Sequence, residues 1–122
     1  MPVKSLNSSV IRWPTKAEVS SAVAGWAQEL VSRRPDILKI VVIGSYARRD
    51  WGVGSDLDLI LIIKESSESF ERRSLAFDIS AFPVPVDLMV YTECEWRKLA
   101  EEGSRFYLTV MREGDWILAG GN

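Results

Sequence analysis

Three aspartates stand where their carboxylates could act together. Asp56 and Asp58 open the run DLDLILII, and Asp87 lies within the run VDLMVY. Residues two apart on a strand project to the same face, so Asp56 and Asp58 would point together while Leu57 points the other way. Two carboxylates this close repel each other. A divalent cation would relieve that repulsion by taking both as hard oxygen ligands.

Asp87 would complete this acidic set if its strand lies beside the strand of Asp58. It stands between Val86 and Leu88, in a segment where a carboxylate is costly without a partner. Three carboxylates on one face can hold one or two Mg²⁺ ions and support in-line phosphoryl or nucleotidyl transfer. The pattern therefore predicts a site in which Asp56, Asp58 and Asp87 act as metal ligands and catalytic residues.

A second candidate element, Gly44-Ser45, follows the apolar run ILKIVVI. Glycine at a strand end lets the backbone approach a ligand closely, and a helix beginning just afterwards would direct its N–H groups at an anion. The Ser45 hydroxyl would add a donor, and Arg48 and Arg49 would add positive charge for phosphate. Together these residues predict a triphosphate-binding turn beside the metal site.

Each of these patterns has a simpler explanation when taken alone. Asp-x-Asp occurs in solvated loops and Ca²⁺ sites, Gly-Ser ordinarily marks a turn, and Asp87 could be a hydrogen-bonded carboxylate at a strand end. Their joint order is more specific: a strand, Gly-Ser, ten residues, Asp-x-Asp at a strand start, and an aspartate in a later strand. This order favours the functional interpretation.

Composition narrows the chemistry further. The chain has 122 residues, a formal net charge of -2 and 47% hydrophobic residues, which predicts one folded domain over residues 1–122. It contains no histidine, which excludes Ser-His-Asp catalysis and zinc sites that rely on histidine. Cys94 is the only cysteine, so no intrachain disulfide can form. Any metal must therefore be held by oxygen ligands.

The chain carries no feature of a membrane or nucleic-acid-coating protein. Its N-terminus lacks the apolar segment of a signal peptide, and the run Leu59–Ile63 is far too short to span a bilayer. The slight acidity gives no reason to expect nucleic acid as a required partner. These observations predict a soluble, cytoplasmic protein, and Trp51, in the loop before Asp56, is expected to pack locally.

Capping patterns and periodicity place these residues on secondary structure. Thr15 and Glu18 form a capping box that opens a helix ending near 33–34, and a second box at Thr92 and Glu95 opens a helix to about 102. Strands are expected at 37–43, 56–63, 86–91 and 116–118, and further helices at 46–50, 69–77 and 104–113. Arg72-Arg73 is interpreted as a solvated pair. The expected fold is α/β (α+β), a small mixed β-sheet flanked by helices.

The segment GSYARRDWGVGSDLD, residues 44–58, strongly resembles the signature of the DNA polymerase β-like nucleotidyltransferase superfamily. The similarity is greatest to its minimal branch, the MNT domains, which combine Gly-Ser, about ten residues, Asp-x-Asp and a later aspartate. Ser55 and the Tyr46–Arg48 run also match this signature. Many members have glycine where this chain has Arg49, a difference that removes no metal ligand.

The resemblance implies the nucleotidyltransferase fold, with Asp56, Asp58 and Asp87 as Mg²⁺ ligands and Asp87 also assisting the acceptor hydroxyl. It implies ATP or another NTP as donor, with Ser55 among the phosphate-binding residues. Many minimal members pair with a helical HEPN-type toxin and act as antitoxins, some by transferring AMP to a tyrosine of the toxin. The short chain suggests that such a partner, or a homodimer, supplies the acceptor surface.

Two other functions compatible with the sequence are not enzymatic. The chain could neutralise a helical partner by contact alone, as a non-catalytic antitoxin or nucleotide-binding module. It could also be a Ca²⁺ or nucleotide sensor, although Gly44-Ser45 would then have no purpose.

Overall fold

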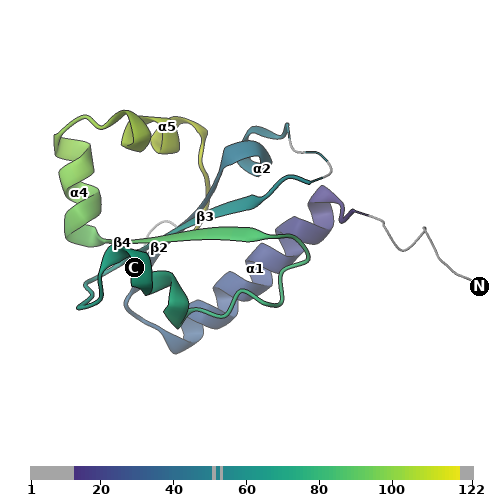
Figure 1. The fold of residues 1–122 in the computed structure, drawn as a ribbon, viewed down its shortest axis with the longest axis horizontal. Helices are drawn as coiled ribbons and strands as arrows, with labels where there is room; N and C mark the ends of the chain where they lie inside the picture. The colour runs from purple at the N-terminus through teal and green to yellow at the C-terminus, as the bar shows by residue number, and fades with distance from the viewer. Residues whose placement is uncertain (1–12, 51, 53, 119–122) are drawn as a thin grey trace, which may run out of the picture.

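The computed structural model describes residues 13–50, 52 and 54–118, so the expectations for the first twelve residues and for Trp51 concern residues outside it. The elements, labelled in Figure 1, are α1 (Lys16–Arg33), β2 (Ile37–Ile43), α2 (Gly44–Arg48), β3 (Leu57–Ile63), α3 (Phe70–Arg73), the 3₁₀ helix η2 (Ser74–Ala76), β4 (Val86–Thr92), α4 (Glu93–Glu101), α5 (Arg105–Glu113) and β5 (Asp115–Leu118). The predicted class, a small mixed sheet flanked by helices, is confirmed.

The four strands form one sheet in the order β4-β3-β2-β5. β2 runs antiparallel to both β3 and β5, whereas β3 and β4 are parallel. A parallel pair needs a crossover connection, and residues 64–85, which include α3 and η2, provide it. The two aspartate-bearing strands are therefore neighbours that start at the same edge of the sheet.

Hydrophobic clusters cover both faces of this sheet. On one face, Val19, Val23 and Ala27 of α1 pack against strand residues such as Leu59 and Leu61. On the other, Trp96 of α4 and Val110 of α5 pack against Val41, Ile60 and Ile62. Figure 1 shows α1 on one side of the sheet and α4 and α5 on the other. β3 faces apolar side chains on both sides, which explains its nearly continuous hydrophobic sequence.

Both predicted capping boxes are present. Thr15 accepts a hydrogen bond from the Glu18 N–H while the Glu18 carboxylate accepts one from Thr15 N–H, and Thr92 and Glu95 repeat this exchange. Each box satisfies two backbone donors that the first helical turn leaves without partners. Among the described helices, none combines the length and hydrophobicity that crossing a bilayer requires.

Two element boundaries differ from the prediction at the place where the site forms. The short helix expected from Tyr46 begins at Gly44, and Arg49, in the left-handed conformation at φ 68°, ends it. The strand expected from Asp56 begins at Leu57. Gly44 and Ser45 therefore belong to the first turn of α2, and Asp56 stands just before the strand.

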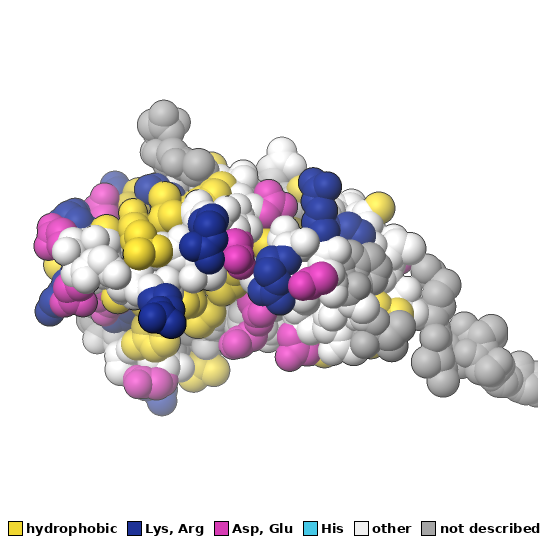
Figure 2. Space-filling model, turned by 90° about the horizontal axis from the view of Figure 1, so that it is seen from above, with side chains coloured by type: hydrophobic (Ala, Val, Ile, Leu, Met, Phe, Trp, Pro, Cys, Tyr) yellow, Lys and Arg dark blue, Asp and Glu magenta, His cyan; other side chains and the backbone are white. Residues whose placement is uncertain are grey.

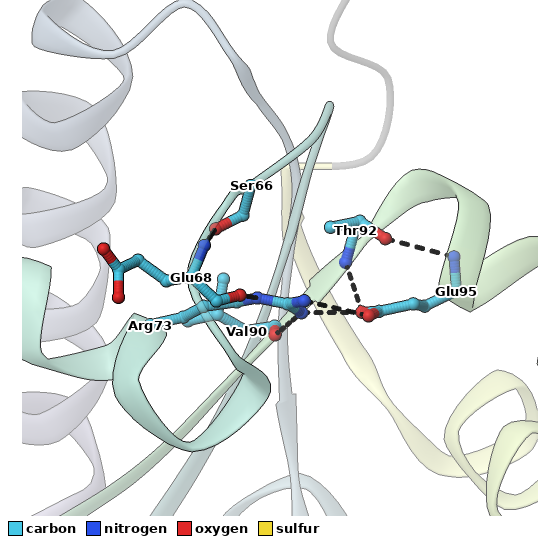
Figure 3. Close-up of polar contacts among 6 residues, drawn as sticks. All are labelled: Ser66, Glu68, Arg73, Val90, Thr92 and Glu95. Carbon is cyan, nitrogen blue, oxygen red and sulfur yellow. Dashed lines mark hydrogen bonds and ion pairs between the residues drawn. The ribbon is translucent and has the colours of Figure 1, made fainter.

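The interpretation of Arg73 as a solvated residue is wrong. Its side chain is only 8% exposed and makes two hydrogen bonds to the Glu95 carboxylate, Nη1 to Oε1 at 2.6 Å and Nη2 to Oε2 at 2.9 Å. Arg73 also donates to the carbonyl oxygens of Glu68 and Val90, both at 3.0 Å. Figure 3 shows how this guanidinium joins α3 to the end of β4 and the start of α4. Burial is tolerated because most of its donors are paired.

Candidate active site

Asp58 and Asp87 lie side by side on the parallel pair β3–β4, where they occupy the same register position. Strand alternation places Leu57 and Leu59 in the cluster beneath α1, so Asp58 projects from the opposite face, which Ile60 shares. Asp56, two residues before Asp58, is exposed. The fold therefore brings together the two aspartates that are distant in sequence.

Gly44 lies directly against Asp58. The antiparallel register pairs Ile43 with Asp58, so the turn that follows β2 begins beside this carboxylate. Gly44 has φ 73°, and a Cβ built on it would lie 3.3 Å from Asp58 Cγ and closer still to Oδ2. Both the left-handed backbone and the close approach require glycine here. The predicted Gly-Ser turn and acidic residues are thus adjacent.

The charges of this cluster change the pKa of Asp58. Partial burial raises the pKa of its carboxyl, and the negative charges of Asp87 and Asp56 raise it further, while Arg48 acts in the opposite direction. The three carboxylates therefore interact electrostatically, and the effect of crowding falls on the central one. This is the condition in which a cation stabilises a carboxylate cluster.

The remaining predicted phosphate ligands, Arg48, Ser45 and Ser55, have local partners of their own. The Arg48 Nε is 3.1 Å from Asp50 Oδ2, in an exposed ion pair. The Ser45 carbonyl accepts hydrogen bonds from the N–H groups of Arg49 and Asp50, which close α2. The Ser55 hydroxyl accepts a 2.8 Å hydrogen bond from Gly52 N–H, and its own proton can still be donated to another acceptor.

The chemistry of these donors suits a hard divalent cation such as Mg²⁺, because carboxylate oxygens are its preferred protein ligands. Within residues 13–50, 52 and 54–118, however, no three acidic or cysteine side chains are close enough to form a ready-made metal site. The fit therefore lies in the chemistry of the carboxylates and in the charges of Asp87 and Asp56 near Asp58.

Sequence reasoning placed no site residue on α5, which forms the wall beside α2. Phe106, Thr109 and Glu113 of α5 line a cavity together with Gly44 and Arg48. No sequence motif marks these residues, because their proximity to the Gly-Ser turn depends on the packing of α5 over the sheet. Figure 2, which views the molecule from above Figure 1, shows apolar side chains on the side of α4 and α5, and charges of both signs both around them and toward α2.

An acidic face beside a glycine turn suits enzymes that transfer phosphorus-containing groups with the help of metal ions. Residues 25–107, well over half of the chain, match the family model described as the nucleotidyltransferase domain. The chain belongs to this family and is a nucleotidyltransferase. No curated protein matches the sequence.

Comparison with solved structures agrees with the fold. A candidate nucleotidyltransferase from Sulfolobus solfataricus is similar over 68% of this chain and 75% of its own, with a TM-score of 0.56 and 21% identity, which shows a shared fold. A toxin-antitoxin structure with AMP-PNP aligns with 79% of this chain and 73% of its own, at 16% identity. Its TM-score of 0.48 is too low to establish a common fold.

Proposed function

We propose that this nucleotidyltransferase moves AMP from ATP to a hydroxyl group, with Asp56, Asp58 and Asp87 holding Mg²⁺. The observation that supports this most directly is the in-register pairing of Asp58 with Asp87, with Gly44 against the same carboxylate. Among the described residues, Asp56 and Asp87 are the acidic side chains that contribute to the raised pKa of Asp58. The proposal explains why charged groups are retained on an otherwise apolar face.

Bound Mg²⁺ would supply charge neutralisation for the phosphate oxygens of the donor. Asp58, near the start of β3, and Asp56, just before that strand, would fix the position of the donor relative to the sheet. Asp87, exposed on the neighbouring strand, would accept the proton of the attacking hydroxyl or orient that hydroxyl for attack. The new bond joins this oxygen to the α-phosphorus, and pyrophosphate leaves.

The triphosphate would lie along the turn formed by Gly44 and Ser45. Gly44 leaves the backbone accessible because it has no side chain, and the Ser45 and Ser55 hydroxyls can donate to phosphate oxygens. Arg48, whose charge already acts on Asp58, would balance the negative charge of the phosphates. Its exposed partner Asp50 would be exchanged for the ligand at small cost.

For the acceptor, we propose a hydroxyl of a helical partner protein of the HEPN type. This choice follows from the similarity of residues 44–58 to the minimal branch of the superfamily. The acidic face would need an acceptor surface opposite it, and in this proposal the partner provides it. A homodimer would be the alternative source of that surface.

Transfer can be tested with ATP labelled at different phosphates. Incubation with Mg²⁺ and the candidate partner should label the partner from α-labelled ATP but not from γ-labelled ATP. Asp58→Asn should abolish the labelling. Asp115→Asn is the matched control, since Asp115 pairs with Val42 and belongs to the side of the sheet that α1 covers. Label from the γ-position, or equal labelling by Asp58→Asn, would contradict nucleotidyl transfer.

Neutralisation by contact alone makes a different prediction for the acidic residues. A folded Asp56→Ala/Asp58→Ala protein should then neutralise its partner as well as the wild type does. If neutralisation depends on nucleotidyl transfer, this double variant should bind the partner but fail to neutralise it.

A further inference from the structure

We infer that the cavity between α2 and α5 binds the nucleoside end of the donor, and that it selects a base with an exocyclic amino group. The inference rests on the proposed function, because it extends the same site away from the phosphates. The observations that support it differ from those behind the proposed function, because they concern α5, which carries none of the proposed metal or phosphate ligands.

The cavity has the right position. Its volume is about 180 Å³, and its walls include Ile43, Gly44 and Arg48 on one side and α5 on the other. Ile43 pairs with Asp58 across β2 and β3, and Gly44 contacts the Asp58 carboxylate. A ligand whose phosphates follow the Gly44 turn would therefore have this cavity beside it.

Size and lining favour one ring system of a nucleotide. Pockets that enclose a whole drug-sized ligand are roughly 300–1,000 Å³. At about 180 Å³, this cavity would hold a single base or sugar. Ile43, Phe106 and Val110 make it predominantly apolar, and an aromatic side chain offers a surface on which a base can stack. The side-chain donors in this lining are Arg48 and Thr109, and the Glu113 carboxylate would repel a triphosphate.

The polar groups of α5 favour a base. Thr109 contributes a hydroxyl and Glu113 a carboxylate that is 32% exposed. An ionised carboxylate only accepts hydrogen bonds and repels phosphate, so it matches the amino groups of adenine, cytosine or guanine. Its contact with Arg112 is long, 3.4 Å from Nη2 to Oε2, which leaves most of its accepting capacity available. Arg48 would then face the negatively charged phosphates. Glu113 would accept hydrogen bonds from the amino group of the base.

The position of α5 is fixed by close packing at its C-terminal end. Gly114 N–H donates to the Val110 carbonyl at 2.8 Å. A Cβ at Gly114 would lie 2.6 Å from that carbonyl oxygen and 2.7 Å from Val41 Cγ2. The chain thus passes from α5 into β5 in direct contact with β2, so the α5 wall is held at a defined distance from the site.

The inference is tested by calorimetry with two probes, Mg²⁺–ATP and Mg²⁺–tripolyphosphate, which has phosphates but no nucleoside. Thr109→Phe should fill the cavity and weaken ATP binding about ten-fold or more, while tripolyphosphate binding stays within about two-fold. Leu108→Phe is the matched control, because Leu108 is the neighbouring residue of α5 and is 51% exposed. It should change neither affinity. A thermal melt confirms that each variant is folded.

Glu113→Gln supplies a second measurement that does not depend on filling the cavity. The wild type should bind ATP more tightly than UTP, whose base has no exocyclic amino group, and Glu113→Gln should reduce this ratio about ten-fold. If folded Thr109→Phe binds ATP normally, or weakens both probes equally, the cavity is not the nucleoside site. If label transfer in that case still depends on Asp58, the proposed function stands and only the nucleoside site is wrong. A wild type that binds neither probe would overturn both.

Discussion

At Gly44 the Asp58 carboxylate occupies the space that any side chain would need. The residue combines φ 73° with contact to the Asp58 carboxylate, so two separate costs oppose substitution. The left-handed conformation alone costs an L-residue about 1 kcal/mol or more. The collision adds a displacement of Asp58, the carboxylate at the centre of the acidic face.

Gly44→Ala should therefore lower stability by about 2 kcal/mol and abolish nucleotidyl transfer. Gly103→Ala is the matched control, since Gly103 has φ 65° but a Cβ at that position would meet no heavy atom within 4 Å beyond its chain neighbours. It should lose about 1 kcal/mol and keep full activity. Denaturant melts and the α-label assay measure both effects, and equal activity of the two variants would refute the close contact.

Asp58→Asn should stabilise the metal-free protein at neutral pH, raising its melting temperature by a few degrees. Burial and the charges of Asp87 and Asp56 raise the pKa of Asp58, so folding favours its neutral form. In metal-free wild type this costs stability as pH rises above the usual carboxyl pKa of 3.8. Melts in chelator should show the gain for Asp58→Asn, and Asp115→Asn should not share it.

The juxtaposition of Asp58 and Asp87 was predictable from strand alternation and one assumption, that β3 and β4 are neighbours. Asp56 lies just before β3, so its place in the acidic set stays a prediction. Arg73 was misjudged because its partner Glu95 lies 22 residues away on another helix. Thr109 and Glu113 have no local signature either, since their place beside Gly44 depends on how α5 packs.

Among the elements, α3 and α4 are joined by the Arg73–Glu95 pair. Arg73 lowers the pKa of Glu95 from 4.5 to about 2, and the N–H of Thr92 contributes to the same effect. Because the folded pKa is depressed, the ionised carboxylate stabilises the fold above about pH 4.5, and this contribution is lost as pH falls toward 2. Glu95 is 42% exposed, so solvent reduces the effect.

Glu95→Gln should destabilise the protein by about 1–2 kcal/mol at pH 7, since Arg73 stays buried without its charged partner. The difference from wild type should shrink steadily between pH 4.5 and pH 2. Glu93→Gln serves as control, because Glu93 meets Arg97 at 4.0 Å in a pair exposed on both sides. A constant deficit for Glu95→Gln across that pH range would show that its charge is irrelevant.

Element boundaries were predictable wherever side chains within one turn determine them. Thr15 and Thr92 start their helices as expected, because each capping box is closed by a residue three positions along. The start of α2 was misplaced because Gly44 enters the helix at a positive φ, which no neighbouring residue in the sequence indicates. The strand order was not predicted, since pairing of β5 with β2 requires residues 40–42 and 115–118 to meet across a long stretch of chain.

For the whole molecule, binding of donor and cation together should raise thermal stability. A ligand at one hundred times its dissociation constant adds about 2.7 kcal/mol if it binds only the folded state. Mg²⁺ with ATP should therefore raise the melting temperature more than the separate effects of Mg²⁺ and ATP combined. Asp56→Ala/Asp58→Ala should lose this extra shift, and an unchanged shift would place the cation elsewhere.

The shared register of Ile43, Asp58 and Asp87 limits how the length of this chain can vary. Removing one residue within β3 would exchange the two faces of the strand. Leu57 and Leu59 would then point toward the substrate, and Asp58 would point into the packing beneath α1. Adding residues to the crossover at 64–85 leaves the pairing of β3 with β4 in phase. Insertions and deletions compatible with catalysis should therefore be confined to the segments that connect strands and helices. Deleting the residues of β3 one at a time should abolish transfer in every case.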